Sequence, residues 1–456
     1  MNARKLANYT DEKAQELLKT LYLCAKEKLN RKFHALYDKI YRPDILMEAW
    51  KRVKRKKGSG GVDGQTIEEI VTKYGESKFL NELYAQLKGN NYNPNPVLRT
   101  YIPKDDGKKR PLGIPTIKDR VVQMATKMVI EPIFEADFQD CSFGFRPKRN
   151  AHQAMAKIRK AGRNSSWVVD VDIQGYFDNI NQDKLMKLVE QKINDRRVLK
   201  LIRKWLQAGI MEEGNLRNPL TGTPQGGVIS PILANVYLHY VLDLWFEKRV
   251  RKQCNGQAYI VRYADDFVCC FQYKGEAEQF FHSLKLRLKK FNLEIAEDKT
   301  KIIPFGRFAE QNANHQGRSK PATFDFLGFT HYCGKSKQGK FRVKRKTSRK
   351  KVQAKLKETK EWMKINRNKD IHMIMDRFKR SLVGYYNYYC ITDNTQSVNK
   401  FRDKIGYLLF KWLNRRSQRK SFTWDKFRLF LNKYPLPYVR VKVNIYHLRK
   451  EISYIL

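Results

Sequence analysis

The sequence predicts an α+β fold in which helices flank a central region of alternating strands and helices. Apolar residues recur every three or four positions in residues 12–40, and again from Asp119 to about Phe138, a spacing typical of amphipathic helices. From 167 to 335, short apolar runs typical of strands alternate with helical stretches. After residue 335 the pattern predicts a helical and densely basic chain to near residue 430.

The charge of the chain indicates a polyanionic partner. Its 456 residues include 92 Lys and Arg against 46 Asp and Glu, a formal net charge of +46. A chain that repels itself this strongly needs a polyanion, and nucleic acid is the usual one. No run reaches the roughly 18 apolar residues of a membrane span, so we expect no membrane partner. Seven scattered cysteines and an N-terminus without an apolar signal core favour a cytoplasmic location.

The N-terminal third adds a loop and a predicted hairpin. A basic run at 51–57 leads into the glycine-rich sequence GSGGVDG at 58–64. Glycines beside lysines can cradle phosphate, but this loop lacks the G-K-[ST] ending of a nucleotide P-loop. It is either a loop that contacts a nucleic-acid backbone or a plain solvated turn. Residues 97–117 then predict two short strands joined by a turn at Asp105-Asp106-Gly107.

The tetrapeptide Tyr263-Ala264-Asp265-Asp266, within AYIVRYADDFVCCF, is the most informative feature of the chain. Side chains alternate along a strand, so neither a buried nor a solvated face suits both carboxylates. Adjacent carboxylates also raise one another's pKa unless a cation lies between them. A hard divalent cation with oxygen ligands, such as Mg²⁺, is the natural counter-charge. The alternative is a plain polar turn in a hairpin.

Further carboxylates lie upstream in WVVDVDIQGYFDNINQDKL, at the end of a predicted strand. Asp170 and Asp172 alternate with valines, and charges buried there need a cation or an ionic partner. The spacing favours a structural salt bridge for Asp170 and leaves Asp172 as the candidate third metal ligand. Asp178 is expected to cap the next helix.

Several motifs now occur in one order along the chain. They are Asp172 with Phe177, TGTPQGGVISPILANVYLH (221–239), RYADDF, LEIAEDKTK (293–301) and FDFLGF (324–329). This series resembles the successive blocks of a reverse transcriptase, specifically the bacterial group II intron reverse transcriptase, or maturase. YIPKDDGKKRPLGIPTIKDRVVQ and CSFGFRPKRNAHQA resemble its finger blocks, and SLVGYYNYYC and RRSQRKSFTWDKF its thumb or maturase region. The resemblance covers residues from about 40 to 456.

The resemblance implies a right-hand polymerase with fingers, a palm of antiparallel sheet plus helices, and a basic α-helical thumb. Its parts would be an N-terminal extension and start of the fingers (1–95), fingers (96–169), palm with the catalytic site (170–335) and thumb/maturase (X) region (336–456). Many members add a zinc-supported H-N-H endonuclease with paired Cys-x-x-Cys. The last cysteine here is Cys390 and no such pair exists, so second-strand DNA cleavage is not expected.

The implied activity is RNA-directed DNA synthesis by two-metal nucleotidyl transfer. Asp172, Asp265 and Asp266 would hold two Mg²⁺ ions, with Mn²⁺ as a substitute. Lys299 matches the family lysine near the leaving pyrophosphate and is a candidate general acid. The implied partners are an RNA template, group II intron RNA, a DNA primer or target DNA, and dNTPs.

Four residues match family positions at the incoming dNTP: Lys104, Arg110, Phe177 and Gln225. Lys104 and Arg110 would grip the triphosphate, Arg as a fork and Lys as a point charge; otherwise they are ordinary solvated residues. Phe177 would lie beneath the ribose and exclude a 2′ hydroxyl, or simply pack in the core. Gln225 and the two glycines after it would allow close backbone approach to the nascent pair, or form a bland turn.

Basic residues outside the site predict a nucleic-acid surface. From Lys335 to Lys357, twelve of twenty-three residues are Lys or Arg and none is acidic, which predicts phosphate contacts rather than a solvated face laced by salt bridges. The tyrosines at 385, 386, 388 and 389 cannot all point one way along a helix, so some pack and others are free to meet RNA. Trp412 and Trp424 are expected in the core. The candidate contacts are Arg146, Lys344, Arg345, Lys346, Arg349, Lys350 and Lys351.

Other interpretations of the same residues stay open. A reverse transcriptase recruited to phage defence, diversity generation or a CRISPR locus would carry identical catalytic residues, and only the flanking DNA separates it from an intron enzyme. A splicing-only maturase is disfavoured by the intact aspartates and Lys299. An RNA polymerase is disfavoured by Phe177.

Overall fold

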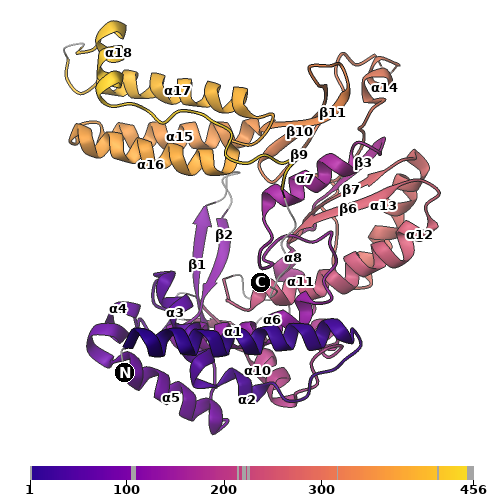
Figure 1. The fold of residues 1–456 in the computed structure, drawn as a ribbon, viewed down its shortest axis with the longest axis vertical. Helices are drawn as coiled ribbons and strands as arrows, with labels where there is room; N and C mark the ends of the chain where they lie inside the picture. The colour runs from indigo at the N-terminus through magenta and orange to yellow at the C-terminus, as the bar shows by residue number, and fades with distance from the viewer. Residues whose placement is uncertain are drawn as a thin grey trace.

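The computed structural model describes residues 3–103, 109–212, 215–217, 222, 226–315, 317–418 and 421–448. Within these ranges helices flank a four-stranded and a three-stranded antiparallel sheet and a four-stranded mixed one, so the α+β prediction is confirmed. Figure 1 shows N-terminal helices at one end, C-terminal helices at the other, and the central strands and their helices beside them.

The N-terminal end is a helical cluster built around α6. The expected amphipathic helix ends at Glu27, and residues 28–36 run on without a helix to α2. Both α1 and α3 pack against α6, burying Trp50 of α3 almost completely. Its elements are α1 (Ala3–Glu27), α2 (Tyr37–Ile40), α3 (Pro43–Arg55), α4 (Ile67–Glu69), η1 (Ile70–Tyr74), α5 (Glu76–Lys88) and α6 (Ile117–Glu135).

The predicted hairpin between α5 and α6 is present. Strand β1 (Val97–Pro103) pairs antiparallel with β2 (Lys109–Ile114), and β1 also pairs in parallel with β4 (Ile210–Glu212), which continues to β5 (Asn215–Arg217). The predicted turn at 105–107 lies outside the described residues. The hairpin extends from the N-terminal helices into the space between the two ends of the molecule (Figure 1).

The central sheet has the strand order β6-β7-β3-β8, all antiparallel. Its two faces are both covered, because β3 sends Val169 and Val171 into the main core and Val168 into a second cluster on the opposite face. The helix α13 contacts one face and α7 the other. Its strands are β3 (Trp167–Val171), β6 (Ala258–Tyr263), β7 (Asp266–Phe271) and β8 (Lys301–Pro304).

Helices precede, connect and follow these strands along the chain. Cys269 and Cys270 of β7 are fully buried, as expected for core residues. The helices are α7 (Ala151–Ala161), α8 (Tyr176–Asn179), α9 (Gln182–Val189), α10 (Arg196–Gln207), α11 (Ser230–Leu238), η2 (His239–Asp243), η3 (Phe246–Val250), α12 (Arg251–Gln253), α13 (Lys274–Lys289) and α14 (Ala309–His315).

A third sheet corrects the prediction that the chain is helical from residue 335. Strands β9 (Phe324–Phe326), β10 (Phe329–Lys335) and β11 (Phe341–Thr347) pair in the order β11-β10-β9. The sequence FRVKRKT of β11 alternates between buried and more exposed residues, the period of a strand. The abundance of lysine and arginine there hid this two-residue period.

The C-terminal helices form their own core. Trp412 is buried as expected, whereas Trp424, the first residue of α18, is 48% exposed although it stacks on Phe410 of α17. Tyr385 and Tyr386 pack in this core. The helices are α15 (Arg349–Asn366), α16 (Ile371–Tyr389), α17 (Thr395–Leu413) and α18 (Trp424–Lys433). None of the described helices is long and apolar enough to cross a membrane.

Residues 441–448, here called the return segment, run back from these helices to the central sheet. Val443 forms a parallel bridge with Ile391, directly after α16. Ile445 is buried in a cluster with Met155 of α7 and Phe329 of β10. Arg159 of α7 lies 4.4 Å from the ring centre of Tyr446. The return segment therefore contacts the C-terminal helices, the third sheet and the covering helix of the central sheet at once.

Candidate active site

A cleft of about 1840 Å³ opens between the β1–β2 hairpin and the central sheet. Its walls come mainly from five separate stretches of chain, with further residues from α3, the loop after it, α6 and α13, so it exists only in the folded protein. These stretches are Arg110–Pro115, Asp172–Asp178, Gly226–Pro231, Tyr263–Asp266 and Leu293–Lys299. The structure thus brings together, in one cavity, the described parts of four motifs that lie far apart in the sequence.

The tetrapeptide Tyr263–Asp266, hereafter the acidic turn, connects β6 to β7. Tyr263 and Asp266 pair across the hairpin, leaving Ala264 and Asp265 as the two loop residues. Ala264 has a φ of 59°, the left-handed region that a residue with a Cβ adopts at a cost of about 1–3 kcal/mol. The acidic turn therefore has the geometry of the polar hairpin turn that was the alternative interpretation of this sequence. Its backbone is nevertheless held in a conformation that Ala264 does not favour.

Burial disfavours the charged forms of the two carboxyl groups of the acidic turn. Burial raises the pKa of Asp265, and the charge of Asp172 raises it further. Burial also raises the pKa of Asp266 well above its usual range, with contributions from the charges of Asp170, Asp265 and Asp172. A cation bound among these carboxylates would lower their pKa values again, because it favours their charged forms.

Asp170 has no ion pair within the described ranges, contrary to the salt bridge expected for it. It follows Val168 on the same face of β3, and burial raises its pKa to about 7, with Asp325 and Asp172 adding to the effect. Lys301, its register partner on β8, only lowers that pKa from a distance. Asp170 therefore adds to the negative potential beside the acidic turn.

Asp172 lies just beyond the end of β3 and forms an ion pair with Lys299. The Lys299 Nζ is 2.8 Å from the Asp172 Oδ2, and both side chains are partly exposed to the cleft. The backbone holds the two together, since Ala296 donates its N–H to the Asp172 carbonyl at 2.8 Å. The ammonium group thus neutralises one of the three candidate metal ligands in this structure.

The three carboxylates fit a divalent metal by their chemistry rather than as a ready-made cage. No group of three or more His, Cys, Asp or Glu side chains in the described ranges is clustered as a metal site. Mg²⁺, however, keeps several waters and binds proteins through one or two carboxylates together with substrate phosphates. Asp265 and Asp266, whose pKa values burial raises, line one cleft with Asp172, which matches that mode.

The structure places two of the four predicted dNTP contacts. Arg110 is exposed on β2, lines the cleft and lowers the pKa of Asp265 through its charge. Phe177 on α8 lines the cleft as well and is half-buried against the main core, its ring edge-to-face with Tyr176 at 5.3 Å. Lys104 and Gln225 lie outside the described residues.

Two of the predicted nucleic-acid contacts are wrong because they are buried. Arg146 forms a two-pronged ion pair with Glu135, both side chains being 3% exposed. Arg345 is fully buried in β11, where the strand alternation turns it inward, and it reaches Asp393 at 3.4 Å. The other five predicted contacts keep an exposed or half-buried position: Lys344, Lys346, Arg349, Lys350 and Lys351.

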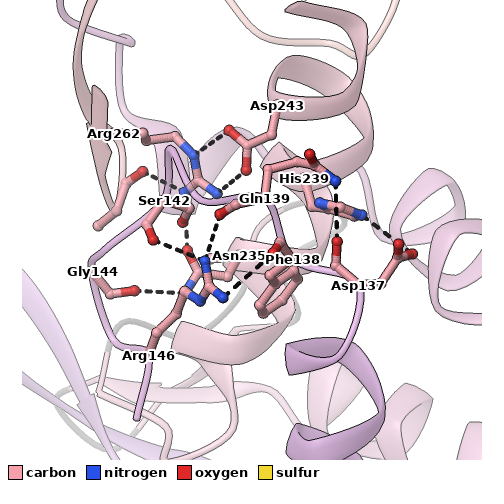
Figure 2. Close-up of polar contacts among 12 residues, drawn as sticks. Asp137, Phe138, Gln139, Ser142, Gly144, Arg146, Asn235, His239, Asp243 and Arg262 are labelled. Atoms are coloured by element: carbon pink, nitrogen blue, oxygen red, sulfur yellow. Dashed lines mark hydrogen bonds and ion pairs between the residues drawn. The ribbon is translucent and has the colours of Figure 1, made fainter. Parts of the chain in front are cut away.

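Beneath the acidic turn lies a buried polar network that the sequence motifs did not reveal (Figure 2). Arg262 of β6 pairs with Asp243 of η2, and neither side chain has any exposed surface. Asn235 of α11 and Gly144 complete the network through further hydrogen bonds. A charge in the middle of the apolar run AYIVRY was the available signal, because a buried arginine requires a partner.

Comparisons with known proteins match two parts of the chain. Residues 102–331 match the family "Reverse transcriptase (RNA-dependent DNA polymerase)". Residues 349–430 match the "Group II intron, maturase-specific domain". These two matches cover the β1–β2 hairpin with the central sheet, and the C-terminal helices, respectively.

Individual relatives agree with these matches. Group II intron-encoded protein LtrA of Lactococcus lactis subsp. cremoris is 33% identical over 338 residues, which cover 61% of this chain and 56% of that protein. Protein YkfC of Escherichia coli is 34% identical over 297 residues, covering 58% and 77%. The chain therefore spans about half the length of the first relative and most of the second. The resemblance inferred from the motifs is confirmed.

Proposed function

The chain belongs to the reverse transcriptase family, and from that premise we propose that it is the RNA-directed DNA polymerase of a group II intron. It would copy RNA into DNA and bind intron RNA to assist splicing and mobility, as a cytoplasmic ribonucleoprotein. The observation that carries the proposal is the placement of Asp172, Asp265 and Asp266 in one cleft with the exposed cations of Arg110 and Lys299. The maturase-specific match supports the intron role.

The three aspartates are the proposed holders of two Mg²⁺ ions, with Mn²⁺ able to substitute. Bound there, the metal would activate the primer 3′ hydroxyl and neutralise charge on the triphosphate. Asp265 and Asp266 would present their carboxylates from the acidic turn, and Asp172 from the end of β3. Since Lys299 already contacts Asp172, loading of the site requires its ammonium group to move off that carboxylate.

The cations and the aromatic ring around the aspartates have separate proposed roles. Arg110, exposed on β2, would bind the triphosphate in a forked contact, and Lys104 would add a point charge. Lys299, once displaced from Asp172, would give a proton to the leaving pyrophosphate. Phe177 would lie under the sugar. Gln225 and its glycines would contact the nascent pair.

We assign residues 96–169 to the fingers, 170–335 to the palm and 336–456 to the thumb and maturase region, with 1–95 as an N-terminal extension and start of the fingers. The family matches at 102–331 and 349–430 support this division. The exposed cations Lys346, Arg349 and Lys350 would contact template and intron RNA through phosphates.

Primer extension on an RNA template tests the polymerase activity. With Mg²⁺ and dNTPs the wild-type protein should extend a DNA primer, and Asp265→Ala should reduce the rate by at least about 10²-fold, since metal-assisted charge stabilisation is worth several kcal/mol. Asp183→Ala, at an exposed carboxylate of α9 outside the cleft, is the matched control and should extend normally.

Intron RNA binding must be measured alongside extension. If the wild-type protein binds intron RNA but extends no primer, the polymerase proposal fails and the splicing-only interpretation takes its place. If Asp183→Ala is as inactive as Asp265→Ala, the loss does not report on the cleft.

A further inference from the structure

The network beneath the acidic turn centres on the guanidinium group of Arg262. It donates four hydrogen bonds: from Nε and Nη2 to the two carboxylate oxygens of Asp243, and from Nη1 to the Asn235 Oδ1 at 3.0 Å and the Ala264 carbonyl at 2.8 Å. The last of these acceptors belongs to the acidic turn itself. Arg262 thus joins the two helical segments behind the sheet, α11 and η2, to the turn that carries the catalytic aspartates (Figure 2).

The segment 141–144 lies on the other side of the same turn. Arg262 donates its backbone N–H to the Cys141 carbonyl, and its own carbonyl accepts the N–H of Phe143, at 2.8 and 2.9 Å, so this segment is joined to β6 by an isolated parallel bridge. A Cβ on Gly144 would lie 2.4 Å from the Ala264 backbone nitrogen, too close for any side chain. Asn235 fixes Gly144 in this position through a hydrogen bond from its Nδ2 to the Gly144 carbonyl, at 2.8 Å.

The acidic turn needs such external support for two reasons. Ala264 is held at a positive φ, which is unfavourable for a residue with a Cβ. Asp265 and Asp266 also carry like charges side by side, and without a cation they would be expected to move apart. The Ala264 carbonyl belongs to the peptide bond that joins Ala264 to Asp265. The hydrogen bond that it accepts from Arg262 therefore opposes both relaxation of the Ala264 backbone and movement of Asp265 away from Asp266.

The charge balance of the network suits this task. Asp243 neutralises the guanidinium group through a two-pronged ion pair, with no exposed surface on either side chain. The network can therefore hold the turn by hydrogen bonding without placing an unpaired positive charge where a metal must bind. A buried ion pair is a poor source of stability compared with apolar packing, so a positional role explains its presence better than a stabilising one.

We propose that Arg262, anchored by Asp243 and Asn235, is a positioning residue that fixes the acidic turn so that Asp265 and Asp266 are ready to bind metal before nucleic acid or dNTP arrives. This inference rests on the proposed function, since it assigns metal binding to those carboxylates. Lysine cannot replace Arg262 in this role, because an ammonium group lacks the planar fork that reaches Asp243, Asn235 and Ala264 together.

Direct Mn²⁺ binding to the protein without nucleic acid tests the proposal. The signal that disappears in Asp265→Ala defines the site. Arg262→Lys should weaken binding at that site by at least about tenfold, because the turn loses charge-assisted hydrogen bonds that hold it in place. The Mg²⁺ concentration for half-maximal primer extension should rise in parallel.

Arg146→Lys is the matched control, because Arg146 is almost as buried, has the same two-pronged pairing with a carboxylate, and makes no hydrogen bond to the acidic turn. It should lower the thermal unfolding midpoint without changing Mn²⁺ affinity. Equal Mn²⁺ affinities for Arg262→Lys and Arg146→Lys would overturn the proposal. So would a wild-type protein that shows no Asp265-dependent Mn²⁺ binding.

A second variant decides the matter if Arg262→Lys does not fold. Asn235→Ser removes the bonds to Arg262 and Gly144 but keeps the Arg262–Asp243 pair, and it should weaken Mn²⁺ binding several-fold; unchanged affinity contradicts the proposal. The two proposals fail separately. A wild-type protein inactive in primer extension, with the Mn²⁺ difference intact, would count against the polymerase activity and leave the positioning role standing.

Discussion

Phe177 lies where one ring can both pack in the core and serve the proposed sugar selectivity. Its ring is half-buried against the main core and also lines the cleft that holds Asp172 and Asp265. The two interpretations that the sequence left open, core packing and a contact with the sugar, therefore do not exclude each other. A ring braced on one side by Tyr176 is rigid enough to exclude an extra hydroxyl on the other.

Phe177→Val should admit ribonucleotides. The smaller side chain leaves room for a 2′ hydroxyl, so the preference for dNTPs over rNTPs in primer extension should fall by at least about tenfold, the scale of selectivity that one group in an apolar pocket confers. Phe281→Val, at a half-buried phenylalanine of α13 outside the cleft, is the control and should keep the preference. An unchanged ratio for Phe177→Val would refute the sugar contact.

Residues of this site could be predicted from the sequence where charged side chains interrupt an apolar strand pattern. Two adjacent aspartates inside an apolar run, and Asp172 after alternating valines, stood out because strand geometry does not accommodate them otherwise. Arg146 and Arg345 were misassigned because lysine and arginine look alike in a sequence whether they meet solvent or a buried carboxylate. Only the fold brings Glu135 to Arg146, and no local pattern contains that pairing.

At the scale of elements, the hairpin β10–β11 is the main difference from the prediction, because β11 occupies a region predicted to be helical. The hairpin β1–β2 was predictable because proline and glycine mark its ends, whereas β11 is so rich in cations that its alternation was obscured. Inside this hairpin His331 of β10 faces Arg345 of β11. His331 has no exposed surface, stacks flat on Phe324, and neither of its ring nitrogens has a hydrogen-bond partner in the described part of the chain.

His331 should make the stability of the protein depend on pH. Burial, together with the charge of Arg345, lowers its pKa from 6.5 to about 3. Because the unfolded chain binds the proton and the folded chain does not, stability is fully present above pH 6.5 and is lost as pH falls toward 3. This one group should cost about 2 kcal/mol at pH 5.

His331→Phe keeps a flat ring that can stack on Phe324 but cannot be protonated. Denaturant unfolding at pH 7.5 and pH 5 should show a smaller loss of stability for this variant than for the wild-type protein. His282→Phe, at an exposed position of α13, should behave as the wild type does. If the acid-induced loss is the same in all three proteins, His331 is not its source.

At the scale of the whole molecule, the excess positive charge is enriched between Lys335 and Lys357, where twelve of twenty-three residues are Lys or Arg. The net charge of +46 includes the exposed cations at the start of α15, which follow directly on β11. The proposed RNA ligand would release counterions when its phosphates meet these residues. Charge of this kind gives affinity without base selectivity.

RNA affinity should therefore fall steeply with salt. Between 50 and 200 mM salt the loss should be about 10³–10⁵-fold if 6–10 phosphates are contacted. Replacing Lys346, Arg349 and Lys350 with glutamine should lower the slope of log K against log salt by about 2–3. The control replaces three exposed lysines of η1 and α5 with glutamine: Lys73, Lys78 and Lys88. Since α5 lies near the opposite end of the molecule (Figure 1), this variant has the same net charge but keeps the cations around α15. Equal slopes for the two triple variants would contradict a defined RNA surface around α15.

The return segment has a consequence for how the protein is made. Residues 441–448 contact α7, β10 and the end of α16, yet a ribosome synthesises them after all of these elements. Domains generally fold in the order in which they emerge, so the central sheet and the C-terminal helices can each form before the segment that ties them together exists. The contacts that residues 441–448 make with both parts can therefore form only after these residues have left the exit tunnel.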